Sequence, residues 1–213
     1  MSAEAIPEAC RAMNASGLNQ GTSGNVSVRD GDGMVVTPSG VPYEAMTPEM
    51  MVRVASDGTA SGDLVPSSEW RMHFDIYRAR PEAMAVVHVH SPYAAALSCH
   101  RRGIPAFHYM VAASGGADIR CADYATFGTQ ALSDAMLRAL EGRRACLLAN
   151  HGQIAFGPSL DKALWLAGEV EALARQYLLA LGLGDPVILD EAEMERVLGL
   201  FAAYGVQPAL DGA

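Results

Sequence analysis

The chain has 213 residues, half of them hydrophobic, and this length and composition suit one globular domain with a sizeable core, residues 1–213. Its formal net charge of -9 and its scattered Lys and Arg residues argue against a nucleic-acid-binding protein. No apolar run reaches the roughly 20 residues that span a bilayer, and the N-terminus lacks a basic segment followed by an apolar signal core, so we expect a cytoplasmic protein.

The first quarter of the chain predicts a helix followed by hairpins. Residues 4–14 carry apolar residues at helical spacing, with Pro7 near the start, where its missing N–H does no harm. A glycine-rich turn over residues 20–24 then leads into alternating β-residues, and residues 34–37 predict a second strand. Asp57-Gly58 marks a further hairpin turn.

The middle of the chain alternates helices with strands. A helix begins near residues 66–70 and runs to about residue 79, and we expect Ser67 or Ser68 as its N-cap and Glu69 in its first turn. The strand at residues 84–90 is followed by Ser91-Pro92, which starts another helix.

The second half of the chain predicts a helix at residues 129–140, a buried strand at 145–149, a long amphipathic helix at 160–181 and a shorter helix at 191–204. Strands thus alternate with helices, but the early hairpins break a strict βαβ rhythm. We therefore expect an α/β protein with three αβα layers, in which a mixed, largely antiparallel sheet is flanked by helices.

Histidines stand at the ends of two predicted strands. His88 and His90 alternate along one strand and therefore share a face, while His151 follows the strand at residues 145–149. The pair alone is as typical of an ordinary polar strand end as of a metal site. With His151 and Glu69 added, the residue types match a zinc site with three protein nitrogens and an exchangeable fourth position.

The four cysteines are far apart and none lies in a CxxC pair, which argues against a closed structural zinc site and a disulfide framework. Small polar turns at residues 21–25, 37–40 and 67–68 could bind a phosphate through backbone N–H groups and hydroxyls. A metal beside such turns suggests a phosphorylated substrate whose oxygens chelate the ion.

Seven stretches resemble the class II, metal-dependent aldolases of the L-fuculose-1-phosphate aldolase type, a fold family that also contains L-ribulose-5-phosphate 4-epimerase. These stretches cover almost the whole chain, in order: GLNQGTSGNVSVRDGDGMVVTPSGVPYE, LVPSSEWRMHF, AVVHVHSP, IPAFHYMVAASGG, ADYATFGT, NHGQIAF and KALWLAGEVEALA.

The resemblance implies one Zn ion per subunit, with Mn or Co as substitutes, bound by His88, His90, His151 and Glu69. It implies that Glu69 also acts as acid/base, that Tyr109 serves the aldehyde half of the substrate and that Tyr204 lies in a tail that closes the site. It further implies a phosphate site made of Thr22, Asn25, Ser39, Gly40, Ser67 and Ser68.

The implied reaction is the reversible cleavage of a ketose 1-phosphate to dihydroxyacetone phosphate and a short aldehyde. The implied assembly is a homotetramer with sites between subunits, so that Tyr109 and Tyr204 could act across an interface. Asn150 precedes His151 where the fuculose enzyme carries another histidine, and this leaves L-fuculose, 5-deoxyribulose and 5-methylthioribulose 1-phosphates as candidates.

Two other enzyme activities and one non-catalytic role are alternatives for a chain with this resemblance. L-ribulose-5-phosphate 4-epimerase and methylthioribulose-1-phosphate dehydratase share the scaffold, and the HYM segment around Tyr109 favours the aldolase over the epimerase. A non-catalytic interaction module would be expected to have lost part of the metal set, whereas this chain has all four residues.

Overall fold

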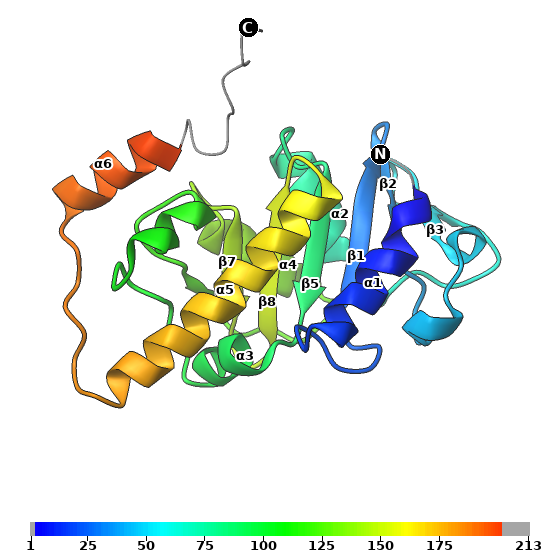
Figure 1. Cartoon of the computed structure of the whole chain (residues 1–213). Helices are drawn as coiled ribbons and strands as arrows, with labels where there is room; N and C mark the ends of the chain where they lie inside the picture. The colour runs from blue at the N-terminus through cyan, green and yellow to red at the C-terminus, as the bar shows by residue number, and fades with distance from the viewer. Residues whose placement is uncertain (1–2, 202–213) are drawn as a thin grey trace, which may run out of the picture.

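A computed structural model describes residues 3–201 and contains one eight-stranded sheet, in the order β4-β3-β2-β1-β5-β8-β7-β6 (Figure 1). Neighbouring strands are antiparallel except for β6 and β7, which are parallel. The strands are β1 Asn25–Asp30, β2 Gly33–Val36, β3 Val52–Val54, β4 Ala60–Ser61, β5 Ala85–Val89, β6 Cys121–Ala122, β7 Ala145–Leu148 and β8 Gly152–Gly157.

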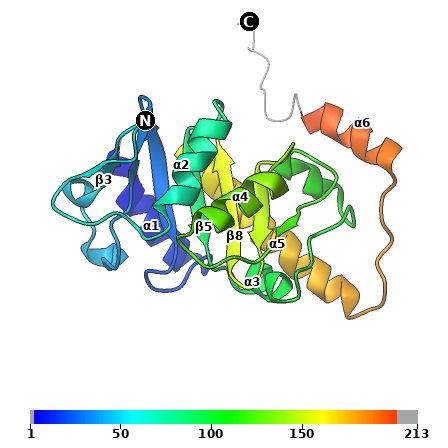
Figure 2. The ribbon, with the colours of Figure 1, turned by 180° about the vertical axis from the view of Figure 1, so that it is seen from behind.

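Helices cover both faces of this sheet. In Figure 1, α1 and α5 cross the near face, and the view from behind in Figure 2 shows α2 and α4 on the other face. The α-helices are α1 Ile6–Ala15, α2 Trp70–Ala79, α3 Pro92–Cys99, α4 Gln130–Ala139, α5 Leu160–Leu181 and α6 Glu191–Phe201. Four 3-10 helices are η1 Ala3–Ala5, η2 Tyr43–Ala45, η3 Pro48–Met50 and η4 Tyr109–Ser114.

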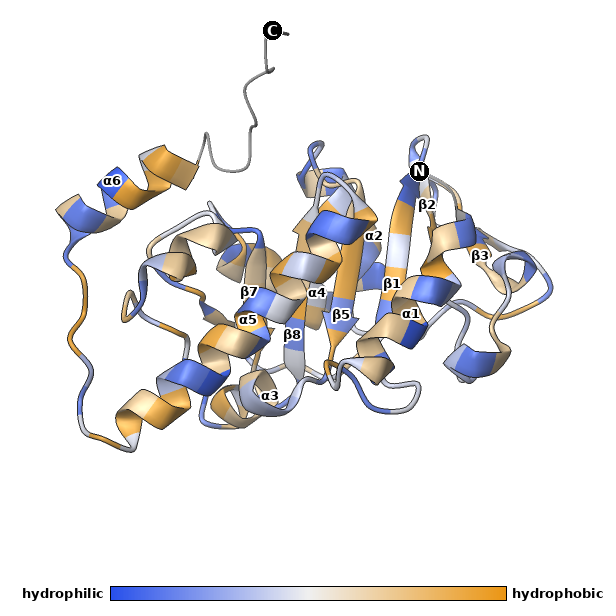
Figure 3. Ribbon diagram, viewed as in Figure 1, coloured by the Kyte–Doolittle hydropathy of each residue, from blue (hydrophilic) through white to orange (hydrophobic). Residues whose placement is uncertain are grey.

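Two hydrophobic cores lie on opposite sides of the sheet. On one side, Val87 and Val89 of β5 pack in a cluster with residues of α1, α3 and α5. On the other side, Val86 packs in a second cluster with residues of α2 and α4. Because side chains alternate along a strand, His88 shares the face of Val86 and points toward the α2 side. Figure 3 shows the matching hydropathy, with largely hydrophobic central strands and alternating residue character along α5.

The three-layer αβα fold and its mixed, largely antiparallel sheet are therefore confirmed. The strand β8 was not predicted, since its short apolar run lies between glycines and forms a strand through pairing with β5 and β7. The last helix ends at Phe201 in the described range, and no helix in residues 3–201 is long and apolar enough to cross a membrane.

Candidate metal centre and substrate pocket

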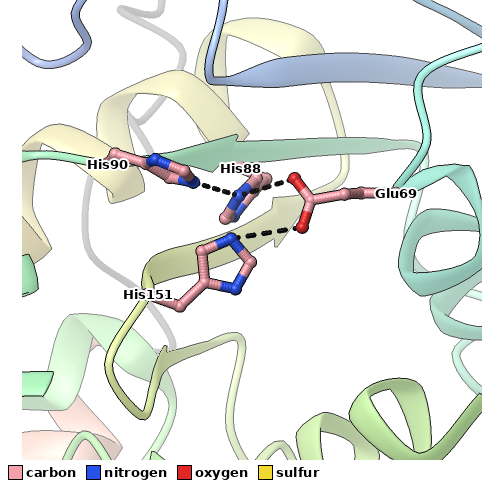
Figure 4. Close-up of side chains that lie close together, drawn as sticks. All are labelled: Glu69, His88, His90 and His151. Atoms are coloured by element: carbon pink, nitrogen blue, oxygen red, sulfur yellow. Dashed lines mark hydrogen bonds and ion pairs between the residues drawn. The ribbon is translucent and has the colours of Figure 1, made fainter. Parts of the chain in front are cut away.

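Four side chains from three parts of the fold converge at one end of the sheet (Figure 4). His88 lies near the end of β5, and His90 follows that strand. His151 lies in the turn between β7 and β8, and Glu69 directly precedes α2. These are the four residues that the sequence predicts as the metal ligands. One ligand atom from each lies within 4.8 Å of the others.

The spacing of these atoms fits a single ion. Nε2 of His88 lies 3.1 Å from Nε2 of His90 and 3.2 Å from Oε2 of Glu69, and Nε2 of His151 lies 3.1 Å from Oε1 of Glu69. Ligands 2.0–2.1 Å from a tetrahedral zinc ion are separated by about 3.3 Å. Among the residues that the structure describes, the buried Oε1 of Glu69 has no hydrogen-bond partner, as expected of an oxygen that would bind a cation.

The imidazole of His88 is set for metal binding by its second nitrogen. His88 Nδ1 lies 2.8 Å from the backbone oxygen of Gln153, and this contact requires a proton on Nδ1. Nε2 of the neutral ring is then unprotonated and directs its lone pair at the cluster. Burial, followed by the nearby His88 and His151, lowers the pKa of His90 to about 4, so His90 is also neutral at pH 7.

Glu69 ionises readily although it is buried. Burial raises the pKa of Glu69, but the adjacent His88 and His151 outweigh this effect and hold that pKa well below its usual range.

The predicted N-cap of α2 is wrong: Glu69, not Ser67 or Ser68, occupies the N-cap position. The Ser67 hydroxyl instead accepts a hydrogen bond of 3.3 Å from the backbone N–H of Glu69, in the turn that precedes α2.

His151 is presented by a tight turn. Asn150 has a left-handed backbone with φ 54°, a conformation that asparagine tolerates better than most residues. The hydroxyl of Ser98 accepts a bond from the His151 N–H at 3.2 Å. A Cβ on Gly152 would lie 2.4 Å from the backbone oxygen of Val89, so β8 can approach β5 this closely only with glycine there.

A cavity of about 250 Å³ opens onto the cluster. Glu69, His90 and His151 line it together with Ser68 and Asn150, both of which the sequence had singled out, and with Tyr124, Ala125 and Phe127, to which it had assigned no role. Tyr124 and Phe127 are 56% and 63% exposed, unusual for aromatic side chains, and both lie in the ADYATFGT stretch. In the sequence, the available signal was two aromatic residues in a short stretch just before the helix predicted at residues 129–140.

Two of the three small polar turns lie side by side. The Ser39 N–H donates to the backbone oxygen of Val65 at 2.9 Å, and the Ser67 N–H donates to that of Thr37 at 3.0 Å. Thr37 also bonds both backbone groups of Val26, so the turn at 37–40 is tied to the start of β1. Ser39, Gly40 and Ser68 are exposed, whereas Ser67 is buried.

The remaining predicted residues differ in their placement. Thr22 is exposed in the loop before β1. Asn25 is buried, and its side chain contacts Glu69 and His73. Tyr109 is 52% exposed on η4, stacks on His108 and is not among the described residues that line the cavity. Tyr204 lies outside the described residues.

Comparison with known proteins shows similarity over nearly the whole chain. Residues 4–178 match the family model described as "Class II Aldolase and Adducin N-terminal domain". A 5-methylthioribulose-1-phosphate/5-deoxyribulose-1-phosphate aldolase of Rhodospirillum rubrum is 53% identical over 93% of this chain and 90% of its own length.

Two further relatives are also named as sugar-phosphate aldolases. An L-fuculose phosphate aldolase of Escherichia coli is 50% identical over 96% of each chain. The solved structure of an L-fuculose 1-phosphate aldolase superposes with a TM-score of 0.91 at 39% identity, covering 94% of this chain and 95% of that one. The chain therefore belongs to the class II aldolase family and is an aldolase of the L-fuculose-1-phosphate aldolase type.

Proposed function

We propose that the chain, acting as one domain over residues 1–213, is a zinc-dependent aldolase that reversibly cleaves a ketose 1-phosphate to dihydroxyacetone phosphate and a short aldehyde. The observation that carries this proposal is the cluster of His88, His90, His151 and Glu69 at the mouth of a cavity. Three imidazoles and one carboxylate are a donor set suited to zinc, with manganese or cobalt as substitutes.

Glu69 is the group proposed to move a proton. A divalent cation at this site supplies positive charge beside the oxygens on which negative charge develops when the C3–C4 bond breaks. In the synthesis direction the Glu69 carboxylate would take a proton from C3 of dihydroxyacetone phosphate, the electron pair left on C3 would form the C3–C4 bond, and a tyrosine would give its proton to the aldehyde oxygen. Cleavage reverses these steps: the tyrosine side chain takes back the C4 hydroxyl proton, the electrons of the C3–C4 bond remain on C3, and the protonated Glu69 returns its proton to C3. Its position at the cavity wall allows the carboxylate to face the substrate.

The phosphate is proposed to bind at the small polar turns. Ser39, Gly40, Ser67 and Ser68 come from two turns that are hydrogen-bonded to each other, with Thr22 and Asn25 from the glycine-rich segment as the remaining candidates. Hydroxyls and backbone N–H groups bind phosphate without a large positive charge, which suits a chain of net charge -9.

The aldehyde end of the substrate is proposed to lie against the aromatic side of the cavity. Tyr124, Ala125 and Phe127 offer apolar surface, and Asn150 offers one polar amide. The substrates in the relatives' names, fuculose phosphate, 5-deoxyribulose 1-phosphate and 5-methylthioribulose 1-phosphate, share an apolar methyl or methylthio terminus. This cavity therefore suits the whole class of such deoxy and methylthio ketose 1-phosphates.

Tyr109 is proposed to serve the aldehyde from a neighbouring subunit. It is exposed and does not line the cavity of its own chain, so it would reach a site only in an assembly such as the homotetramer that the resemblance implies. Tyr204 is proposed to help close the site. Reduced activity of Tyr109→Phe, restored by mixing with subunits that carry Glu69→Gln, would support action across subunits.

A coupled assay for dihydroxyacetone phosphate tests the reaction. The purified enzyme is given L-fuculose 1-phosphate, 5-deoxyribulose 1-phosphate or 5-methylthioribulose 1-phosphate, and glycerol-3-phosphate dehydrogenase reports the triose phosphate through NADH oxidation. We expect release from at least one substrate and loss of release in EDTA. Release from none of them would overturn this substrate class, and the 4-epimerase and dehydratase reactions would then be assayed on the same protein.

A further inference from the structure

A line of buried polar side chains runs behind the Glu69 carboxylate, between β1 and α2. Asn25 and Ser27 alternate on β1 and therefore share the face that α2 covers. Glu69, His73 and Tyr77 follow at four-residue intervals, so they lie along one side of α2 and its N-cap. The strand thus supplies two polar groups opposite three from the helix.

These groups form one continuous chain of hydrogen bonds. Asn25 Nδ2 lies 3.1 Å from Glu69 Oε2, and Asn25 Oδ1 lies 2.6 Å from His73 Nε2. His73 Nδ1 lies 2.7 Å from the Ser27 hydroxyl, which lies 2.8 Å from the Tyr77 hydroxyl. His73 and Ser27 are completely buried and Asn25 is 3% exposed, so solvent does not compete for these bonds.

The carboxylate determines the direction of every bond in the chain. An ionised carboxylate only accepts, so Asn25 must turn its NH₂ to Glu69 and its carbonyl oxygen to His73. His73 must then donate from Nε2, which leaves Nδ1 of the neutral ring to accept from Ser27. Ser27 has donated its single proton and accepts from Tyr77. Burial, and after it the nearby His88, lowers the pKa of His73 to about 3, in keeping with a neutral ring.

We propose that His73 is a positioning residue that, through Asn25, holds Glu69 Oε2 and so keeps Oε1 directed at the metal site. Its consequence for catalysis rests on the function proposed above. The Asn25 side chain uses one N–H for Glu69 and its carbonyl oxygen for His73, so within the described residues its second N–H stays free for a phosphate and the positioning role is compatible with the phosphate role proposed above. A phosphate-binding role would mainly affect KM, whereas a positioning role affects kcat and metal affinity.

The test compares two replacements of His73. His73→Gln can place an NH₂ where Nε2 lies and keep the bond to Asn25, whereas His73→Met fills a similar volume without a donor. Zn²⁺ affinity of the metal-free proteins is measured by competition with a chromogenic chelator. Loss of a direct outer-shell partner of a metal ligand costs about 10-fold to 100-fold in affinity. Because His73 acts on Glu69 through Asn25, we expect the lower end, about tenfold, for His73→Met, with recovery to within about threefold in His73→Gln.

Metal affinity makes this test independent of the reaction. If no ketose 1-phosphate is cleaved, the aldolase proposal fails while the affinity difference still decides the role of His73. If a substrate is cleaved, we expect kcat of His73→Met to fall about tenfold or more with KM within about twofold. Wild-type Zn²⁺ affinity in His73→Met, or equal losses in both variants, would overturn the positioning role.

A second pair of variants covers the case in which His73→Met does not fold. Ser27→Ala removes the hydroxyl that donates to His73 Nδ1, and Ser133→Ala removes an equally buried bond, from Ser133 to Asp75 on another side of α2, at 2.7 Å. Ser27→Ala loses two buried hydrogen bonds, to His73 and Tyr77, and Ser133→Ala loses one, so the control reports the effect of a lost buried hydrogen bond at a site away from His73. We expect only Ser27→Ala to weaken Zn²⁺ binding, by roughly threefold; equal affinities would overturn the proposal.

The tautomer of the His73 ring can be measured directly, and the proposed chain of hydrogen bonds requires one of the two tautomers. Nitrogen-15 NMR of histidine-labelled, metal-free protein should show His73 as the Nε2–H tautomer with an unprotonated Nδ1. In Ser27→Ala the Nε2–H tautomer should persist, because the Asn25 carbonyl oxygen still accepts from Nε2. A wild-type signal with Nδ1 protonated would contradict the direction of the chain and overturn the proposal.

Discussion

Nε2 of His151 lies 3.1 Å from Oε1 of Glu69, yet that oxygen has no hydrogen-bond partner. An imidazole nitrogen and a carboxylate oxygen at this distance have the spacing expected of two ligands of one cation. The turn between β7 and β8 and the start of α2 are far apart in sequence, so the contact exists only in the folded chain.

Removal of metal should abolish cleavage and lower thermal stability. We expect close to one divalent ion per purified chain by elemental analysis, and complete loss of triose phosphate release after EDTA, reversed by Zn²⁺. Because the ion binds the folded state, Tm should fall when it is removed.

His151→Gln is expected to lose most of the bound metal because it removes one imidazole ligand. His100→Gln is the matched control, since His100 is exposed and lies outside the cluster. Equal metal contents in the two variants would remove His151 from the site.

Glu69→Gln should keep most of its metal and lose turnover. The amide oxygen can occupy the ligand position, and the three imidazoles are unchanged, but an amide cannot carry a proton to carbon. General acid–base groups contribute about 100-fold to 10,000-fold, so kcat should fall by that range. Elemental analysis and steady-state kinetics on the same sample check it, and turnover near the wild-type value would exclude Glu69 as the acid/base.

Gly152→Ala should destabilise the fold and reduce metal binding together. The new Cβ would lie 2.4 Å from the Val89 oxygen, so β8 must move away from β5 and carry the adjacent His151 with it. Gly168→Ala in α5 is the control, because nothing lies within 4 Å of its Cβ, and it should stabilise by about 0.5–1 kcal/mol. Urea unfolding measures both, and an unchanged Gly152→Ala protein would contradict the close approach.

Acid should destabilise the protein partly through His73. Its folded-state pKa of about 3 lies below the unfolded value near 6.5, so the unfolded chain binds more protons between these pH values. The stability that the neutral ring contributes is therefore complete above pH 6.5 and is lost as pH falls toward 3. From pH 7 to pH 5 this group should account for about 2 kcal/mol.

Urea unfolding of metal-free wild type and His73→Gln at both pH values isolates this contribution, since every other histidine titrates in both proteins. The wild type should lose about 2 kcal/mol more than the variant over this range. Parallel stability losses would show that His73 is not a neutral, buried ring in the folded state.

Local patterns in the sequence determined much of the architecture and the metal set. Apolar spacing located α5, and alternation along β5 placed His88 and His90 on one face of a strand, because the period of side-chain direction is a property of the backbone itself. Residue types grouped Glu69 with the histidines, although its position before α2 is also typical of an ordinary helix start. Resemblance over seven stretches identified the family and implied the acid/base role of Glu69.

Tertiary structure alone decided which groups stand behind and beside that metal set. Ser27 and His73 look unremarkable in sequence, and Asn25 was expected only as a phosphate ligand. Their hydrogen-bond chain forms because β1 pairs with β5 while α2 packs across the same face. Tyr124 and Phe127 likewise join the cavity through a loop whose course no periodicity describes. Periodicity determines the direction of a side chain, whereas its partners depend on strand pairing and helix packing between segments distant in the chain.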